Sequence, residues 1–111
     1  MEDLKVLKTI DEIRTFSDPY RLQILQQFQS FGVPATVKQV ADRMKEVPAN
    51  VYYHVKKMEK ADILKLVYTK NINGIIAKFY EPSAAKFDIG VENAKEPAKK
   101  LLYTEAQKTV S

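Results

Sequence analysis

The chain has 111 residues, a formal net charge of +4 and a pI near 9.2, with 45% hydrophobic residues and no cysteine. This length supports one domain with a modest core, and the apolar content argues against a disordered chain. The lack of cysteine excludes disulfides, thiolate metal sites and thiol nucleophiles. No apolar run approaches the roughly 18 residues of a membrane span, and the chain starts with acids rather than a secretory pattern, so we expect a cytoplasmic protein.

The positive charge is concentrated in the middle of the chain. Residues 1–35 carry four basic and five acidic side chains, whereas residues 45–70 carry six lysines against three acids. A local basic excess of this kind is typical of a surface that binds a polyanion.

Two helices are predicted in the first third of the chain. Apolar residues spaced by threes indicate an amphipathic helix over residues 3–16. Asp18 is a good N-cap and Pro19 a good first helical residue, so a second helix starts there and runs to about Phe31. Its wide apolar stripe predicts the central buried helix, and Gly32 marks its end.

Two further helices follow in close succession. Thr36 and Gln39 form a capping-box pattern for a helix that ends near Met44, and Pro48 suits the first turn of a helix that runs to Ala61. One side of this second helix is mostly apolar, and the other carries tyrosine and lysines. A short helix, a turn and a basic helix predict a helix-turn-helix, whose second helix enters the DNA major groove.

A β-hairpin is predicted next. Strands at about residues 65–69 and 75–80 flank Asn73-Gly74, which is a strong two-residue hairpin signal. Four helices followed by a hairpin predict an α+β winged helix-turn-helix over residues 1–82, with the hairpin as the wing.

The tail, residues 83–111, is predicted to be a helical extension. Residues 83–92 show no clean period, whereas an amphipathic face begins at Pro97. Because a winged helix leaves little core for such a helix to cover, we expect it to pair with a second copy of the chain. Alternatively, it leads into a sensor domain of a longer protein.

The candidate DNA contacts lie on the second helix of the pair. Tyr53 lies on the side of the helix opposite the apolar stripe. For this residue, contact with DNA is favoured over packing in the core. Tyr52 suits either DNA contact or packing on the preceding helix, and Asn50 suits either a base contact or the helix start. Lys56 and Lys57 are predicted to contact phosphates, although a surface pair between Lys56 and Glu59 is an alternative. The remaining candidates are Lys60, for which a solvated role is equally expected, and Lys70, Asn71, Asn73 and Lys78 in the wing.

Catalytic and cofactor sites are not indicated. The only histidine, His54, lies on the stripe of Val51, Val55 and Met58, so a packed histidine at the edge of the core is expected. One histidine without cysteine cannot build a zinc site, which needs three or four protein ligands. No Gly-rich phosphate loop or catalytic triad pattern is present, and we therefore predict neither an enzyme nor a cofactor.

Two stretches resemble a known family. SDPYRLQIL (residues 17–25) resembles the "DPxRlxIL" opening of ArsR-type winged helix-turn-helix repressors, and VYYHVKKMEKADIL (residues 51–64) resembles their recognition-helix sequence. The resemblance covers residues 16 to about 82. It implies a homodimeric bacterial or archaeal transcriptional regulator that binds a partly palindromic operator.

The resemblance also implies which residues contact DNA, and the chain departs from the family pattern at some positions. DNA contacts would fall on the recognition helix at Ala49, Asn50, Tyr52, Tyr53 and Lys56, and on the wing from Asn71 to Gly74. The usual glycine after the recognition helix is Asp62 here, which also tolerates a left-handed backbone. Because the chain lacks the cysteines and the His and Asp pairs of the metal-sensing members, a metal-sensing function is not expected.

The sequence therefore predicts a sequence-specific DNA-binding regulator, acting as a homodimeric repressor. Two alternatives remain at this point. One is a winged-helix module that binds protein, against which the lysines of the recognition helix argue. The other is the DNA-binding half of a longer effector-sensing regulator.

Overall fold

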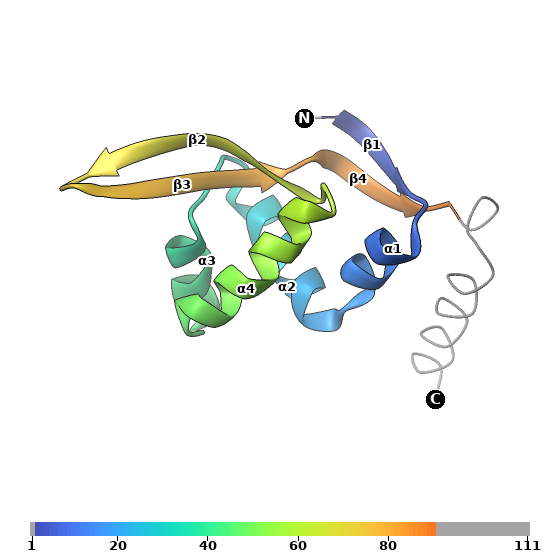
Figure 1. Cartoon of the computed structure of the whole chain (residues 1–111), viewed down its shortest axis with the longest axis horizontal. Helices are drawn as coiled ribbons and strands as arrows, with labels where there is room; N and C mark the ends of the chain where they lie inside the picture. The colour runs from blue at the N-terminus through green and yellow to red at the C-terminus, as the bar shows by residue number, and fades with distance from the viewer. Residues whose placement is uncertain (1, 91–111) are drawn as a thin grey trace.

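The computed structural model describes residues 2–90, which form four helices and four strands (Figure 1). In chain order, they are β1 (Glu2–Leu7), α1 (Ile10–Ser17), α2 (Pro19–Phe31), α3 (Val37–Met44), α4 (Pro48–Lys60), β2 (Leu64–Ile72), β3 (Ile75–Pro82) and β4 (Ala84–Ile89). The helices lie below the strands in Figure 1, and the β2–β3 hairpin projects past α3 at one end. The four predicted helices and the hairpin are thus confirmed, within an α+β winged-helix fold.

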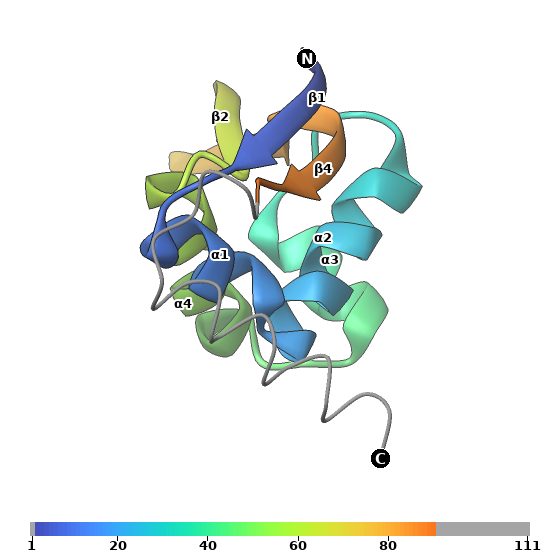
Figure 2. The same ribbon diagram turned by 90° about the vertical axis from the view of Figure 1, so that its right-hand side faces the viewer.

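The N-terminal segment differs from its prediction. The helix expected over residues 3–16 begins only at Ile10, and Glu2–Leu7 form β1, which pairs in parallel with β4 (Figure 2). Local spacing cannot reveal a strand whose partner lies about 80 residues further along the chain. The sequence does hold a signal for the later start, because Thr9 and Glu12 form a capping box.

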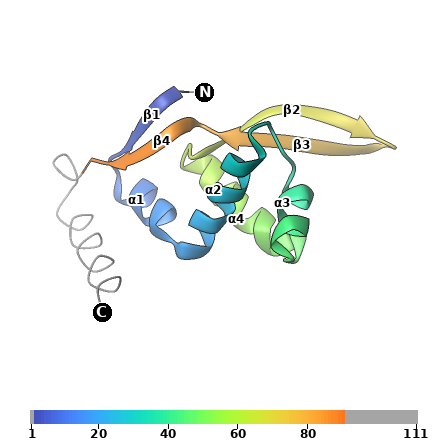
Figure 3. The ribbon, with the colours of Figure 1, turned by 180° about the vertical axis from the view of Figure 1, so that it is seen from behind.

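Helix α2 lies at the centre of the helical layer, as predicted. The Asp18 carboxylate accepts hydrogen bonds from the backbone N–H groups of Tyr20 and Arg21, and Gly32 ends the helix in the left-handed conformation at φ 69°. Seen from behind, α2 lies between α1 and α3 (Figure 3), and it contacts α1, α3, α4 and β3. Its inner side buries Ile24, Leu25 and Phe28.

The helix-turn-helix pair, α3 and α4, forms as the capping signals predicted. The Thr36 hydroxyl accepts from the Gln39 N–H, and the Gln39 side chain accepts from the Thr36 N–H. Lys45 adopts the left-handed conformation that ends α3, and Pro48 starts α4 three residues later. The facing sides of the pair are buried, through Val40 and Ala41 on α3 and Val51, Val55 and Met58 on α4.

The wing is the antiparallel β2–β3 hairpin, which is longer than predicted. Its turn is Asn73-Gly74, with φ angles of 53° and 84°, as this dipeptide favours. At the root, Tyr80 is buried and exchanges two backbone hydrogen bonds with Ala35, of 2.8 and 2.9 Å. The root of the wing is therefore anchored in the core, between α2 and the start of α3.

Strand β4 continues the fold beyond the predicted domain boundary at residue 82. The prediction of a helical extension from residue 83 is wrong for residues Ala84–Ile89. These residues form a strand that pairs with β1. Its inner side packs on α1, where the rings of Phe87 and Phe16 lie 5.6 Å apart. The helix predicted from Pro97 lies outside the described residues, and its role in dimerisation stays a prediction.

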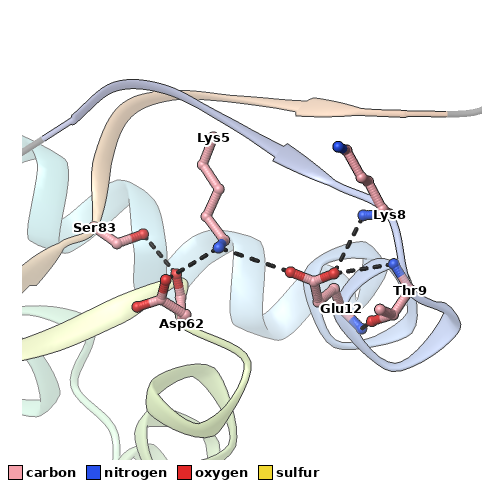
Figure 4. A network of polar contacts seen from close by, with 6 residues as sticks. All are labelled: Lys5, Lys8, Thr9, Glu12, Asp62 and Ser83. Atoms are coloured by element: carbon pink, nitrogen blue, oxygen red, sulfur yellow. Dashed lines mark hydrogen bonds and ion pairs between the residues drawn. The ribbon is translucent and has the colours of Figure 1, made fainter. Parts of the chain in front are cut away.

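A polar network connects the N-terminal strand to the end of α4 (Figure 4). The Lys5 ammonium donates to Asp62 at 3.1 Å and lies 3.7 Å from the Glu12 carboxylate. The Ser83 hydroxyl donates to the Asp62 carbonyl at 2.6 Å. Asp62 has a φ of 59°, so the turn predicted to survive without glycine does form here. This one residue receives contacts from β1 and from the junction of β3 and β4.

The backbone conformation of Asp62 gives a testable stability difference. We expect Asp62→Ala to lower the free energy of unfolding by about 1 kcal/mol, because alanine tolerates the left-handed region poorly. Asp62→Asn keeps that tolerance and removes only the charge facing Lys5, and such an exposed ion pair contributes little. Urea unfolding of the two variants measures the difference. An Asn variant as unstable as the Ala variant would show that the ion pair, and not the backbone, dominates.

Candidate nucleic-acid interface

The outer side of α4 carries the predicted recognition residues. Burial of Val51, Val55 and Met58 turns the opposite side toward solvent, where Tyr52 is 46% and Tyr53 56% exposed. A shallow groove of about 560 Å³ runs along this side, lined by Tyr52, Tyr53, Lys56, Lys57, Glu59 and Lys60. The structure thus brings the α4 candidates together on one surface, which we call the α4 face.

The three lysines of the α4 face differ in their surroundings. Lys56 donates to the Glu59 carboxylate at 2.8 Å, and this hydrogen bond and charge raise the pKa of Lys56. The Lys57 ammonium lies 5.2 Å from the centre of the Tyr53 ring. Neither Lys57 nor Lys60 belongs to an ion pair within residues 2–90. The surface pair considered for Lys56 is therefore present, and Lys57 and Lys60 carry the uncompensated charge.

The two tyrosines are both available for contact. Tyr52 is nearly half exposed, so packing on the preceding helix does not remove it from the surface. Tyr53 is perpendicular to the His54 ring, with ring centres 5.1 Å apart, and the Lys57 ammonium lies 5.2 Å from the centre of the Tyr53 ring. An aromatic ring fixed beside cations suits contact with bases, thymine methyl groups and phosphates.

His54 is packed, as the sequence predicted. Its Nδ1 accepts a hydrogen bond from Arg21 Nε at 3.0 Å, and its ring centre lies 4.9 Å from that of Tyr20. Burial lowers the pKa of His54 and the charge of Arg21 lowers it further, with Lys57 adding to the effect and Asp18 opposing it. His54 thus connects α2 to the α4 face in its neutral form.

The N-terminal turn of α4 is exposed at Ala49 and Asn50. No side chain caps this helix, whose N-cap residue is Val47, so a capping role for Asn50 is not observed. Asn50 borders a second depression, of about 310 Å³, together with Tyr20, Glu46, Tyr53 and His54. Asn50 therefore lines the same depression as Tyr53 and does not cap the helix.

Three of the wing candidates, Asn71, Asn73 and Gly74, form the turn of the hairpin. The Asn71 side-chain oxygen accepts from the Gly74 N–H at 2.8 Å, and Asn73 and Gly74 supply the left-handed turn. The Lys70 ammonium lies 5.9 Å from the centre of the Phe79 ring, which stacks on Tyr68 at 4.6 Å. Sequence reasoning missed the exposed isoleucines next to the turn, which are Ile72, Ile75 and Ile76.

Within residues 2–90, no three histidine, aspartate or glutamate side chains gather so as to hold a metal ion. None of the described helices is long and apolar enough to cross a membrane.

The His54–Arg21 contact predicts a pH-dependent stability. The folded-state pKa of His54 lies below its ordinary value of 6.5. The contribution of His54 to the free energy of unfolding is therefore complete above pH 6.5 and is lost as the pH falls through the folded-state pKa. We expect the urea concentration at the unfolding midpoint to decrease when the pH is lowered from about 8 to about 5.5. This range lies above the pKa values of ordinary carboxylates. His54→Asn keeps an acceptor near Arg21 without titrating there. An equally steep fall in this variant would assign the effect to other groups.

Comparison with known proteins agrees with this geometry. Residues 16–67, from the end of α1 into β2, match a family model described as "Helix-turn-helix domain". A comparison with curated proteins found no match. Domains of this kind are typically DNA-binding and not enzymatic, and the match does not distinguish the ArsR-type branch from others. The described residues thus have a winged-helix fold in which residues 16–67 are similar to a helix-turn-helix domain, and this similarity supports a DNA-binding regulator.

Proposed function

We propose that this protein is a sequence-specific transcriptional regulator that inserts α4 into the major groove of double-stranded DNA. The observation that carries the proposal is the α4 face, an exposed basic and aromatic surface on the second helix of a helix-turn-helix. Such a helix reads base edges mainly with its N-terminal residues. Ala49, Asn50 and Tyr53 would then meet bases, and Lys57 and Lys60 would meet phosphates.

The resemblance to ArsR-type repressors supports a more detailed mechanism. Two copies of the chain would place their α4 helices in successive major grooves of a partly palindromic operator, about 34 Å apart. Occupancy of the operator would exclude the transcription machinery and repress the gene. Since residues 2–90 hold no cluster of metal ligands, the inducing signal proposed here is not metal binding to this part of the chain. Light scattering of the purified protein, alone and with operator DNA, tests the dimer.

The first experiment is a fluorescence anisotropy titration against random duplex DNA at several salt concentrations. Binding that weakens steeply with salt supports the proposal, because neutralising phosphates with lysines releases counterions. No binding even at low salt would contradict it and favour a module that binds protein. If binding is found, operator selection from a random library follows.

The neighbouring lysines provide a matched pair of variants. We expect Lys57→Ala to lower the slope of log affinity against log salt by about 0.9, the value for one lost phosphate contact. Lys56→Ala should lower it less, since the Glu59 carboxylate already compensates that charge. Glu59→Gln should strengthen binding by releasing Lys56. If all three variants had the same salt slope as the unmodified protein, the α4 face would not contact DNA.

Tyr53 is expected to contribute to the choice of sequence. Tyr53→Ala should reduce affinity for the selected operator more than affinity for random DNA, because base contacts carry specificity and phosphate contacts do not. A loss of about 1–3 kcal/mol on the operator is the usual size for one base contact. Tyr53→Phe keeps the ring beside Lys57 and removes only the hydroxyl, so it shows which of the two groups makes the contact. Equal losses on operator and random DNA would refute the assignment.

A further inference from the structure

The tip of the wing carries exposed isoleucines beside its polar turn residues, although wing residues were predicted to contact DNA through polar groups. Ile72 and Ile75 are cross-strand partners on either side of the turn, and they are 48% and 73% exposed. Ile76, the next residue of β3, is also exposed. Exposed β-branched side chains at the end of a projecting hairpin have no packing role in the described fold, which points to a role in contact.

The polar residues at the tip hold the turn. Asn71 accepts from the Gly74 N–H, and Asn73 adopts a φ of 53°. A two-residue turn with both φ angles positive is tight, and it fixes the direction of the strands that enter and leave it. The isoleucine pair therefore lies at the end of a ribbon whose turn is preorganised.

The charge of the wing indicates the partner. From Lys65 to Tyr80, the chain carries Lys65, Lys70 and Lys78 and no acidic residue. A second wing of the same chain would bring like charges together. A polyanion complements this charge, and the α4 face already provides a basic surface for one.

We propose that the Ile72–Ile75 pair is a wedge that enters a DNA groove beside the α4 contact and separates stacked bases there. This rests on the proposed function. Aliphatic side chains that insert between base pairs in the minor groove unstack them and bend the duplex. Pyrimidine–purine steps such as TA open most easily, whereas A-tracts are stiff. The wing thus adds a preference for deformable sequence to the base contacts of α4.

The test compares two duplexes of equal length, one of alternating TA steps and one A-tract. The number of phosphates is then the same in both duplexes, so a difference in affinity does not come from the number of phosphates available. We expect the whole protein to bind the alternating duplex about tenfold more tightly, which is about 1.4 kcal/mol. Fluorescence transfer between dyes at the duplex ends should rise on binding as the DNA bends.

Three variants isolate the wedge. Ile75→Ser should bring the affinity ratio of the two duplexes to about one, with A-tract binding unchanged and the change in fluorescence transfer lost. Ile75→Leu should retain both the affinity ratio and the change in fluorescence transfer, because leucine is also a large aliphatic side chain. Val33→Ser removes an exposed valine between α2 and α3 and should behave as the unmodified protein. Because Ile75 is largely exposed, its replacement should leave thermal unfolding unchanged.

The outcomes separate this inference from the proposed function. A protein that binds neither duplex would overturn the proposed function, and the wedge with it. Binding without preference for the alternating duplex, or a preference that survives Ile75→Ser, would overturn the wedge alone. An equal loss on both duplexes in Ile75→Ser would also overturn it, by showing a contact that does not sense DNA stiffness.

Discussion

Burial of one side of α4 is the constraint on which the candidate interface depends. Val51, Val55 and Met58 recur at the spacing of helical turns, and placing them in the core fixes the rotation of the helix about its axis. Tyr53 and Lys57 then face solvent because no other orientation buries the stripe. Preorganisation of the α4 face therefore comes from the hydrophobic effect acting on the opposite side of the same helix.

The strands at the two ends of the described chain contact the turn that follows α4. Strand β1 pairs with β4, and Lys5 of β1 reaches Asp62 at the end of α4. Ser83, between β3 and β4, donates to the same residue. The left-handed turn at Asp62 sets the direction in which β2 leaves α4 and hence the direction of the wing. Helix α4 and the wing therefore meet at one junction, which is Asp62.

Under the proposed function, the wing and the α4 face would make different physical contributions to DNA binding. The α4 face offers charge and aromatic edges, of which the Lys56–Glu59 pair is an internally compensated part. The wing tip offers aliphatic surface on a rigid turn, with lysines behind it. Charge supplies affinity that depends on salt, whereas a wedge would supply sensitivity to the stiffness of DNA.

The sequence by itself determined the elements whose signals are local. Caps at Asp18 and Thr36, the Pro48 start and the Asn73-Gly74 turn act through neighbouring backbone groups, so helices α2 to α4 and the wing were predictable, as was the position of the α4 lysines. Only the tertiary structure decided that residues 2–7 form a strand, because a strand exists through its partner, and β4 lies far along the chain. It also decided which lysine is compensated and which wing residues are exposed, since both depend on the directions of side chains that spacing alone does not fix.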